Sequence, residues 1–206
     1  MIHEKDSTTE QQILEAAERL FYERGFAMTH TTDIAREVGC NQALVHYYFR
    51  TKEKLFESFF ERKISLFISA FLLAGNDAAN FEEKLKCKIE AHFEILRANP
   101  RLPFLLFNEI STNPKRVEAF KAKFSQLPRP MMEKINEELQ QEASKGNIRK
   151  VEALDLLLSI VSMNVIMFIA SPIIKVVSGA TELEYDRMLE KRKKENVLII
   201  LKSLKP

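Results

Sequence analysis

The chain has 206 residues, which is enough for one large domain or two small ones and for a buried core without disulfides or metal ions. Its 46% hydrophobic and 29% charged residues are ordinary for a soluble globular protein, and its net charge of +2 gives little bulk attraction for a polyanion. Few glycines favour an all-α fold, and two cysteines without metal or redox spacing and a polar N-terminus without a secretory signal predict a cytoplasmic location.

Two helices are predicted in the first forty residues. Residues 9–24 repeat apolar side chains at helical spacing, and Gly25 ends the helix. A second, short helix covers residues 33–38, which a threonine between Thr29 and Thr32 can cap. Gly39 ends it, because glycine tolerates the left-handed conformation that a helix C-terminus often needs.

A third helix begins after Asn41, whose side chain can cap it. Its spacing turns three side chains inward and leaves four on the outer face. The inward residues are Val45, Tyr48 and Phe49, and the outer ones are Gln42, Ala43, His46 and Tyr47. Two helices that cross at a short turn containing glycine form a helix-turn-helix, whose second helix can lie in the major groove of DNA. The sequence therefore predicts a DNA-binding protein.

The same residues resemble the DNA-binding head of the TetR family of one-component transcriptional regulators. The matching segments are 13–25 (ILEAAERLFYERG), 33–39 (DIAREVG) and 43–55 (ALVHYYFRTKEKL), about the first third of the chain. Family members often carry tyrosine where this chain has His46, and a small residue where it has Leu44. These departures concern the target sequence and not the binding mode.

Four side chains on the outer face are candidates for contact with DNA. Gln42 can donate to and accept from adenine at once, although a solvated helix residue is the alternative. Ala43 allows close approach or contact with a thymine methyl group. His46, one helical turn further, is either a base contact or a plain surface histidine, whereas Tyr47 suits a phosphate better than a base.

Phosphate contacts are predicted at the edges of this motif. Lys52 opens the next helix, where the helix dipole and the ammonium can hold one phosphate, and the resemblance implies the same role. The threonines and Asn41 either contact phosphates or only cap helices, and Arg50 and Lys54 are either contacts or solvated. The predicted DNA-binding set is Thr31, Thr32, Asn41, Gln42, Ala43, His46, Tyr47 and Lys52.

The charge of this region counts against DNA binding if it is judged in bulk. Residues 1–60 hold seven Lys and Arg against ten Asp and Glu, a balance of −3. Phosphate contact is local, however, and Arg50, Lys52 and Lys54 cluster where the third helix ends. We expect weak non-specific binding and a shallow salt dependence.

The rest of the chain predicts a helical body. Residues 52–73 form a fourth helix, which the resemblance makes a link between head and body, and a polar break follows at 75–80. Further helices are predicted at 81–98, 102–111, 114–124, 131–145, 151–177 and 182–204. We expect a helix-turn-helix domain at 1–54, a linking helix at 55–75, and a ligand-binding and dimerisation domain at 76–206.

Residues 156–174 are uncharged over about the length of a membrane span. Ser159, Ser162, Asn164 and Pro172 interrupt the run. A helix that is apolar all round is buried either in lipid or in protein. The resemblance implies a helix that packs on the body and on a partner subunit, and we favour this buried dimer helix over a membrane span.

The resemblance also implies that the body binds a small molecule between its helices. An apolar pocket with a few polar groups would suit such a ligand, although residues of these types at helical spacing more often pack in a core. The predicted ligand-binding residues are His92, Phe93, Leu96, Phe104, Phe107, Asn108, Phe124, Met163 and Met167.

Motifs for chemistry are missing from the sequence. It holds no phosphate-binding loop, nucleophile elbow or metal-binding pair, so we expect no enzyme activity, no cofactor and no metal site. The predicted function is that of a homodimeric regulator, a repressor of a near-palindromic double-stranded DNA operator that a small apolar ligand releases. One alternative is a helical protein-interaction module without sequence-specific DNA binding, which would explain the acidic head, and another is a membrane-associated helical protein.

Overall fold

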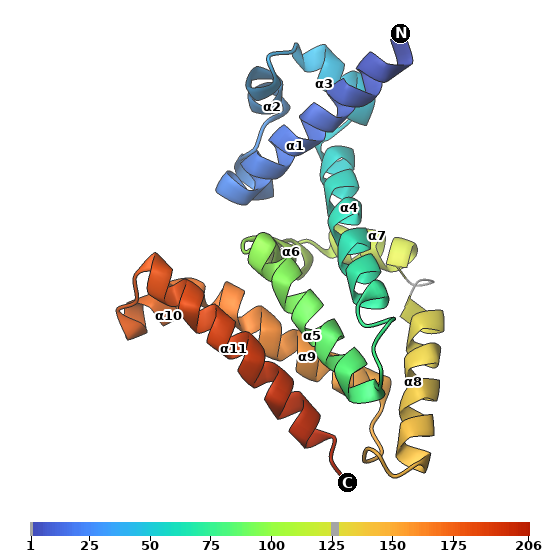
Figure 1. Ribbon diagram of the computed structural model, residues 1–206. Coiled ribbons are helices and arrows are strands. Elements are labelled where there is room, and N and C mark those ends of the chain that lie inside the picture. Colours follow the sequence, from blue (N-terminus) through green and yellow to red (C-terminus); the bar gives the residue numbers. More distant parts are fainter. Residues whose placement is uncertain (1, 125–127) are drawn as a thin grey trace. The chain divides into compact units, whose positions relative to one another are not determined.

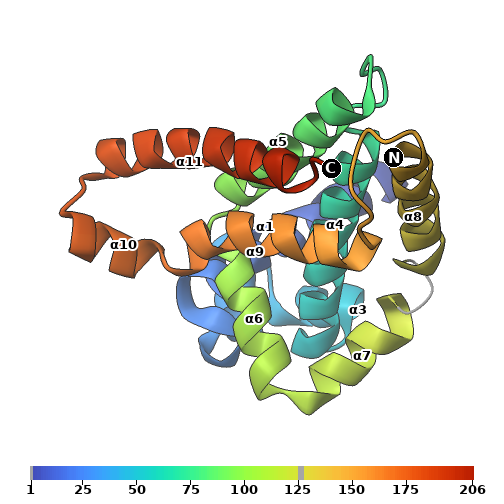
Figure 2. The ribbon, with the colours of Figure 1, turned by 90° about the horizontal axis from the view of Figure 1, so that it is seen from below.

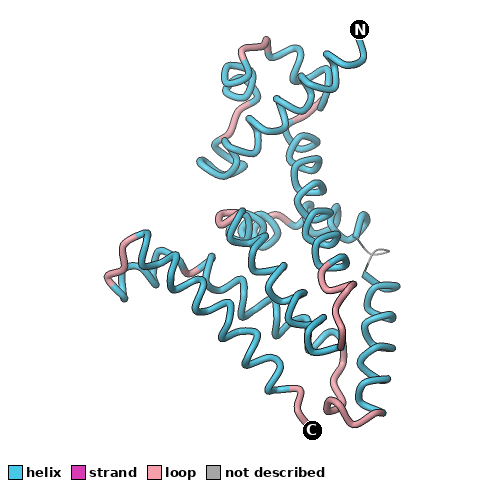
Figure 3. The backbone as a smooth tube through the Cα atoms, in the orientation of Figure 1, coloured by secondary structure: helices cyan, strands magenta, loops and turns pink. Residues whose placement is uncertain are grey.

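The computed structural model describes the backbone of residues 2–124 and 128–206, with the side chains in these ranges except those of residues 2–8, 119, 120, 122–124 and 128. All the regular structure in these ranges is helical (Figure 3). The chain divides into two compact units, Met1–Ile68 and Ser69–Pro206, and the division falls inside one long helix.

Unit 1 contains α1 (Ile2–Met28), α2 (Thr31–Val38), α3 (Gln42–Phe49) and the first part of α4 (Lys52–Leu73) (Figure 1). The first three helices all pack against one another. Gly25 interrupts α1 with a φ of 74°, a conformation that costs glycine little and other residues much. The chain therefore kinks where the sequence predicts the end of the first helix.

Aromatic rings from α1 and α4 form the centre of the core of unit 1. Phe21 of α1 and Phe56 of α4 are each 1% exposed and meet edge to face, with ring centroids 5.0 Å apart. Phe59 is also 1% exposed and lies 5.9 Å from Phe21. Such pairs contribute about 0.5–1.5 kcal/mol beyond the burial of their area. They fix the start of α4 against α1.

Unit 2 is a bundle with α9 at its centre, in contact with five neighbours, and α9 and α11 run side by side in Figure 2. Its helices are α5 (Phe81–Ala98), α6 (Leu102–Thr112), α7 (Pro114–Phe124), α8 (Pro128–Ser144), α9 (Ala153–Ile169), α10 (Ser171–Ser178) and α11 (Glu182–Ser203). The neighbours of α9 are α5, α6, α8, α10 and α11.

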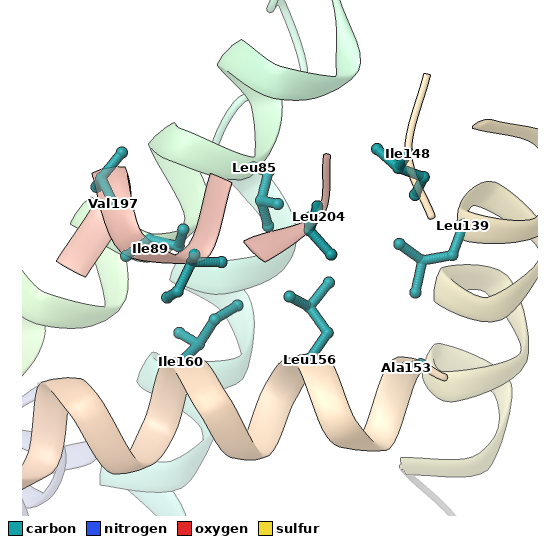
Figure 4. Packing of buried hydrophobic residues seen from close by; sticks show 10 residues of the cluster. Leu85, Ile89, Leu139, Ile148, Ala153, Leu156, Ile160, Val197 and Leu204 are labelled. Atoms are coloured by element: carbon teal, nitrogen blue, oxygen red, sulfur yellow. The ribbon is translucent and has the colours of Figure 1, made fainter. Parts of the chain in front are cut away.

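The core of unit 2 draws aliphatic side chains from α5, α8, α9 and α11 (Figure 4). Ile89, Ile160 and Ile200 are at most 1% exposed. Full burial of one such side chain contributes about 1.5–3 kcal/mol relative to exposure. The remaining members are Leu85, Leu139, Ile148, Ala153, Leu156, Val197 and Leu204.

The prediction of one helix over residues 151–177 is wrong. The structure has α9 and α10, which meet at an angle of 64° after Ala170. Pro172 lies in the first turn of α10, where its missing N–H costs nothing, whereas inside a continuous helix its ring would clash with the preceding turn. Within the described residues no single helix is long and apolar enough to cross a membrane, although α9 and α10 together meet the length and composition criteria as a bent pair.

Two further helix starts differ from prediction. α8 begins at Pro128, so that Pro128 and Pro130 lie in its first turn and do not precede it. The N-cap of α2 is His30, which makes no side-chain capping bond, so the predicted threonine cap is wrong. Thr29 is fully buried, and its hydroxyl donates instead to the carbonyls of Gly25 and Leu20.

Candidate nucleic-acid interface

The third helix has two distinct faces, as the sequence predicts. Val45 and Phe49 are 1% and 6% exposed and anchor α3 in the core of unit 1. The outer face presents Gln42, Ala43, His46 and Tyr47, all exposed. α3 therefore offers a polar surface on a rigidly packed helix.

The turn before α3 has the geometry that the sequence predicts. Gly39 adopts a φ of 75°, and the N–H of Cys40 donates to the carbonyl of Ala35 at 2.9 Å. Asn41 caps α3 by accepting from the N–H of Leu44 at 2.8 Å. A left-handed glycine and a side-chain cap satisfy the free backbone groups at both helix ends. This turn fixes the direction in which α3 leaves α2.

Gln42 and His46 lie in a chain of hydrogen bonds across the outer face. The Nε2 atom of Gln42 is 3.0 Å from the Thr31 hydroxyl oxygen and 3.2 Å from Nε2 of His46. The other ring nitrogen of His46, Nδ1, is 2.9 Å from the carbonyl oxygen of Arg50. Both nitrogens of His46 thus have partners inside unit 1, which the sequence did not reveal.

Lys52 is held at the end of α1. Its ammonium donates to the carbonyls of Phe26 at 2.9 Å and Ala27 at 3.4 Å, and it lies 4.3 Å from the centre of the Phe26 ring. These contacts satisfy carbonyls at the C-terminal end of a helix. They hold Lys52 at the start of α4, and its predicted phosphate contact stays a prediction.

The other predicted DNA-binding residues lie at helix starts. Thr31 and Thr32 open α2, with Thr31 bonded to Gln42, and Asn41 caps α3. The predicted set therefore gathers on α3 and at the starts of α2 and α4 of unit 1. Arg50, with a φ of 60°, is the one described residue other than glycine with a positive φ. No sequence pattern signals this conformation.

The predicted ligand-binding residues of unit 2 fall into two groups. Phe93, Leu96 and Met167 are buried in the bundle, with His92 and Met163 partly buried beside them. On α6, Phe104 and Phe107 are 59% and 63% exposed, and Asn108 is also exposed. The side chain of Phe124 lies outside the described residues. The described side chains of this set therefore differ in exposure, and their binding role stays a prediction.

A buried polar network joins α5, α9 and α11. Asn164 and Asn196 are fully buried, and the amide of Asn196 donates to Oδ1 of Asn164 at 2.9 Å. The amide of Asn164 lies 3.1 Å from the carbonyl of Ile89 and 3.1 Å from Nδ1 of His92. Burial lowers the pKa of His92 to about 4, because the charged ring loses its hydration. The network therefore requires a neutral imidazole.

Three cavities in unit 2 are lined by other residues. One of about 30 Å³ lies between the end of α4 and helices α5, α8 and α9, and it has room for about two water molecules. One of about 300 Å³ is lined by residues that include Arg97, Lys175 and Tyr185, and another of about 300 Å³ lies near Leu204. None of these three includes a predicted ligand-binding residue. Within the described residues no cluster of three or more His, Cys, Asp or Glu could hold a metal ion.

Lys88 of α5 caps the C-terminal end of α4 inside unit 2. Its ammonium donates to the carbonyls of Phe71 at 2.7 Å and Leu72 at 3.3 Å. Burial and the nearby charge of Lys84 lower the pKa of Lys88. The end of α4 is therefore attached to the central bundle by a charged side chain.

Comparison with known proteins identifies the N-terminal unit. Residues 13–59 match the model for bacterial regulatory proteins of the tetR family. Over 91 residues the chain is 30% identical to the fatty acid metabolism regulator protein of Bacillus subtilis (strain 168), a match that covers 44% of this chain and 47% of that protein. Over 55 residues it is 40% identical to the transcriptional regulator TtgR of Pseudomonas putida, covering 27% and 26%. The chain thus spans about half the length, or less, of these curated relatives.

Solved structures share the fold of nearly the whole chain. The fatty acid degradation regulator FadR from Bacillus halodurans superposes with a TM-score of 0.67 at 19% identity, over 92% of this chain and 94% of that one. The TetR family transcriptional regulator PfmR from Thermus thermophilus gives 0.68 at 22% identity, over 94% and 99%. At such identities these structures show the fold alone. The match of residues 13–59, together with the helix-turn-helix that they form, identifies the N-terminal unit as a DNA-binding domain of the kind found in bacterial regulatory proteins of the tetR family.

Proposed function

We propose that this protein is a one-component transcriptional regulator, a repressor that binds a near-palindromic DNA operator as a homodimer. The observation that carries the proposal is the outer face of α3, where Gln42, Ala43, His46 and Tyr47 are exposed on a helix anchored by Val45 and Phe49. A helix presented in this way fits the major groove, and phosphate contacts at its flanks would fix its register.

An exposed apolar face on unit 2 supports the homodimer. On α9, Leu154, Leu158 and Val161 follow helical spacing and are 58%, 57% and 42% exposed. On α11, which packs beside α9, Leu198 and Ile199 are 45% and 39% exposed. Apolar side chains exposed together are typical of a surface that another chain covers. Two copies joined here would bring two recognition helices to one operator, as two-fold symmetry requires.

The ligand in this proposal is a small molecule with an apolar part. Two similar proteins are named for fatty acid metabolism and fatty acid degradation, which agrees with an apolar effector. The ligand must bind the DNA-free conformation more tightly than the DNA-bound one, because only a difference in affinity can shift the equilibrium. Fatty acids of graded chain length are the first compounds to screen.

The test of DNA binding is fluorescence anisotropy with labelled DNA fragments that flank the protein's own gene, with random DNA as competitor at moderate salt. Binding that saturates and survives competition supports a regulator and supplies the operator. A folded dimer that binds no fragment selectively contradicts the proposal and favours a protein-interaction module, provided that the protein has been stripped of bound ligand.

Two substitutions separate the roles of the residues at this surface. Gln42→Ala is expected to reduce the preference for the operator over random DNA, because Gln42 would contact a base edge. Lys52→Ala is expected to weaken binding to all sequences and to lower the salt slope by about one, because Lys52 would contact a phosphate. Arg62→Ala is the matched control, since Arg62 is an exposed cation further along the same helix. If Gln42→Ala and Lys52→Ala changed the affinity for operator and for random DNA in the same way as each other, these roles would be refuted.

The homodimer has its own measurement. Light scattering after size exclusion should give twice the chain mass for the wild type and the chain mass for Leu158→Glu, because a carboxylate would be buried at the interface without a partner. Glu152→Gln, an exposed change at the start of the same helix, is the control. A dimer that persists with Leu158→Glu would place the interface elsewhere.

A further inference from the structure

Helix α3, the proposed recognition helix, carries a series of hydrogen bonds that links four residues and ends on a backbone carbonyl. Thr31 of α2 bonds Gln42 of α3, which bonds His46, whose ring then bonds the carbonyl oxygen of Arg50, over distances of 3.0, 3.2 and 2.9 Å. Gln42 and His46 are both exposed, so the chain lies on the surface that would meet DNA. Each link constrains the next, because donors must face acceptors.

The Arg50 carbonyl, at one end of this hydrogen-bond series, determines which atoms carry the hydrogens in the other bonds. A carbonyl oxygen only accepts, so Nδ1 of His46 carries the hydrogen that points to Arg50. In the neutral ring the other nitrogen, Nε2, is then an acceptor, and Gln42 must turn its amide nitrogen toward it. The two amide hydrogens of Gln42 are taken up by His46 and Thr31. Only Oε1 of Gln42 is left for a base.

We propose that His46, together with Thr31, is a positioning residue that decides whether Gln42 offers DNA an acceptor or a donor. With neutral His46, Gln42 offers Oε1, which accepts from the amino groups of adenine or cytosine in the major groove. With protonated His46, Nε2–H becomes a donor, so the amide of Gln42 must reverse and turn Oε1 toward it. The Thr31 hydroxyl can donate to the same oxygen, and the NH₂ group of Gln42 then faces the keto groups of guanine or thymine.

Histidine is the side chain whose charge ordinarily changes between about pH 5 and 8. On α1 and α2, which pack on α3, Arg19 pairs with Glu37, and Arg24 and Arg36 pair with Asp33. Within the described part of the chain no ion pair involves His46, and the charged residue that follows it in the sequence is Arg50, the C-cap of α3. The sequence preference of the protein would therefore depend on pH.

A first experiment needs no DNA. A long-range ¹H–¹⁵N spectrum of the labelled protein at pH 8, with the His46 signals assigned by comparison with His46→Ala, reports which ring nitrogen carries the hydrogen. We expect the Nδ1–H form, because the Arg50 carbonyl accepts from Nδ1. A neutral ring with its hydrogen on Nε2 would overturn the proposal, whatever the protein binds.

A second experiment measures the base preference itself, and it rests on the proposed function. Operator variants with each of the four base pairs at the position that Gln42→Ala affects are compared by anisotropy at pH 8.0 and pH 5.5. We expect adenine or cytosine to be favoured at pH 8.0 and guanine or thymine at pH 5.5, by about fivefold each way, as one hydrogen bond gained or lost would give. The same preference at both pH values overturns the inference but leaves the regulator, whereas no selective binding at either pH overturns the regulator itself.

Three variants separate the contributions of individual residues to the dependence of base preference on pH. His46→Ala should lose the reversal and keep one preference at both pH values. His30→Ala, which removes an exposed histidine at the start of α2 that makes no capping bond, should keep the reversal. Thr31→Val removes the hydroxyl at nearly constant size and should narrow the preference to about twofold without changing its sign. A reversal that survives in His46→Ala would refute the role of His46.

Discussion

Acid should destabilise unit 2 through one buried histidine. His92 of α5 is partly buried against α9, where its Nδ1 atom lies 3.1 Å from the amide nitrogen of Asn164. Burial lowers the pKa of His92 to about 4. An unfolded chain would hold the same histidine near its ordinary pKa of about 6.5. The unfolded state therefore binds more protons than the folded state between these values, so the free energy of unfolding falls as the pH falls.

The size of this loss follows from the two pKa values. Each pKa unit corresponds to about 1.4 kcal/mol, so the whole interval is worth about 3 kcal/mol. The loss begins near pH 6.5, reaches about 2 kcal/mol at pH 5, and levels off below about pH 4. A proton on Nδ1 of His92 would also point at the amide hydrogens of Asn164. The Asn164 amide is fixed in this orientation, because Asn196 donates to its Oδ1 atom.

The assay is urea unfolding followed by far-UV circular dichroism at several pH values from 4 to 7.5, at one protein concentration, for the wild type and His92→Asn. The asparagine keeps an acceptor for Asn164 but does not titrate in this range. The variant should lose stability at pH 7 through its smaller volume, yet its curve should fall by about 2 kcal/mol less between pH 7 and pH 5. Unit 1 is the same in both proteins, so the difference reports unit 2. Parallel curves for the two proteins would refute the reasoning.

Three further substitutions test the supports of the recognition helix. Asn41→Ala removes the cap of α3 and should cost about 1 kcal/mol, seen as faster hydrogen exchange in residues 42–46. Gly39→Ala places a side chain on a backbone with a φ of 75° and should lower the free energy of unfolding of unit 1 by about 1–2 kcal/mol. An unchanged melting temperature would contradict this backbone strain. Phe59→Ala empties a site that is 1% exposed and should cost about 3–5 kcal/mol, whereas the exposed control Tyr47→Ala should leave the stability nearly unchanged.

Local signals in the sequence were strong enough to predict most of the helices. The bounds 52–73 and 81–98 agree with α4 and α5, because a polar break and an asparagine cap mark their ends. The two faces of α3 were also predictable, since Val45 and Phe49 follow helical spacing. Such features depend on residues close in the chain.

The errors lie where a local pattern had two readings. Residues 151–177 are apolar enough to hide a bend, and Pro172 could either kink one helix or open a second one. Thr29 has the chemistry of a cap but is drawn into the core, where its hydroxyl bonds the carbonyls of Gly25 and Leu20. The hydrogen bond between Thr31 and Gln42 spans eleven positions in the sequence. It depends on how α2 packs against α3, so no local sequence pattern predicts it.

The ion pairs of the N-terminal unit show how its excess of acidic residues bears on DNA binding. Arg19 lies 2.8 Å from Glu37, and Lys54 lies 3.1 Å from Glu57, while Lys52 is bonded to backbone carbonyls. Exposed pairs of this kind are worth about 0–1 kcal/mol, so DNA could break them at small cost. A cation that leaves a carboxylate for a phosphate still leaves that carboxylate close to the DNA, so the net gain from charge is small. Selectivity would then depend mainly on the hydrogen-bonding groups of α3, and the orientation of the Gln42 amide would carry a large share of it.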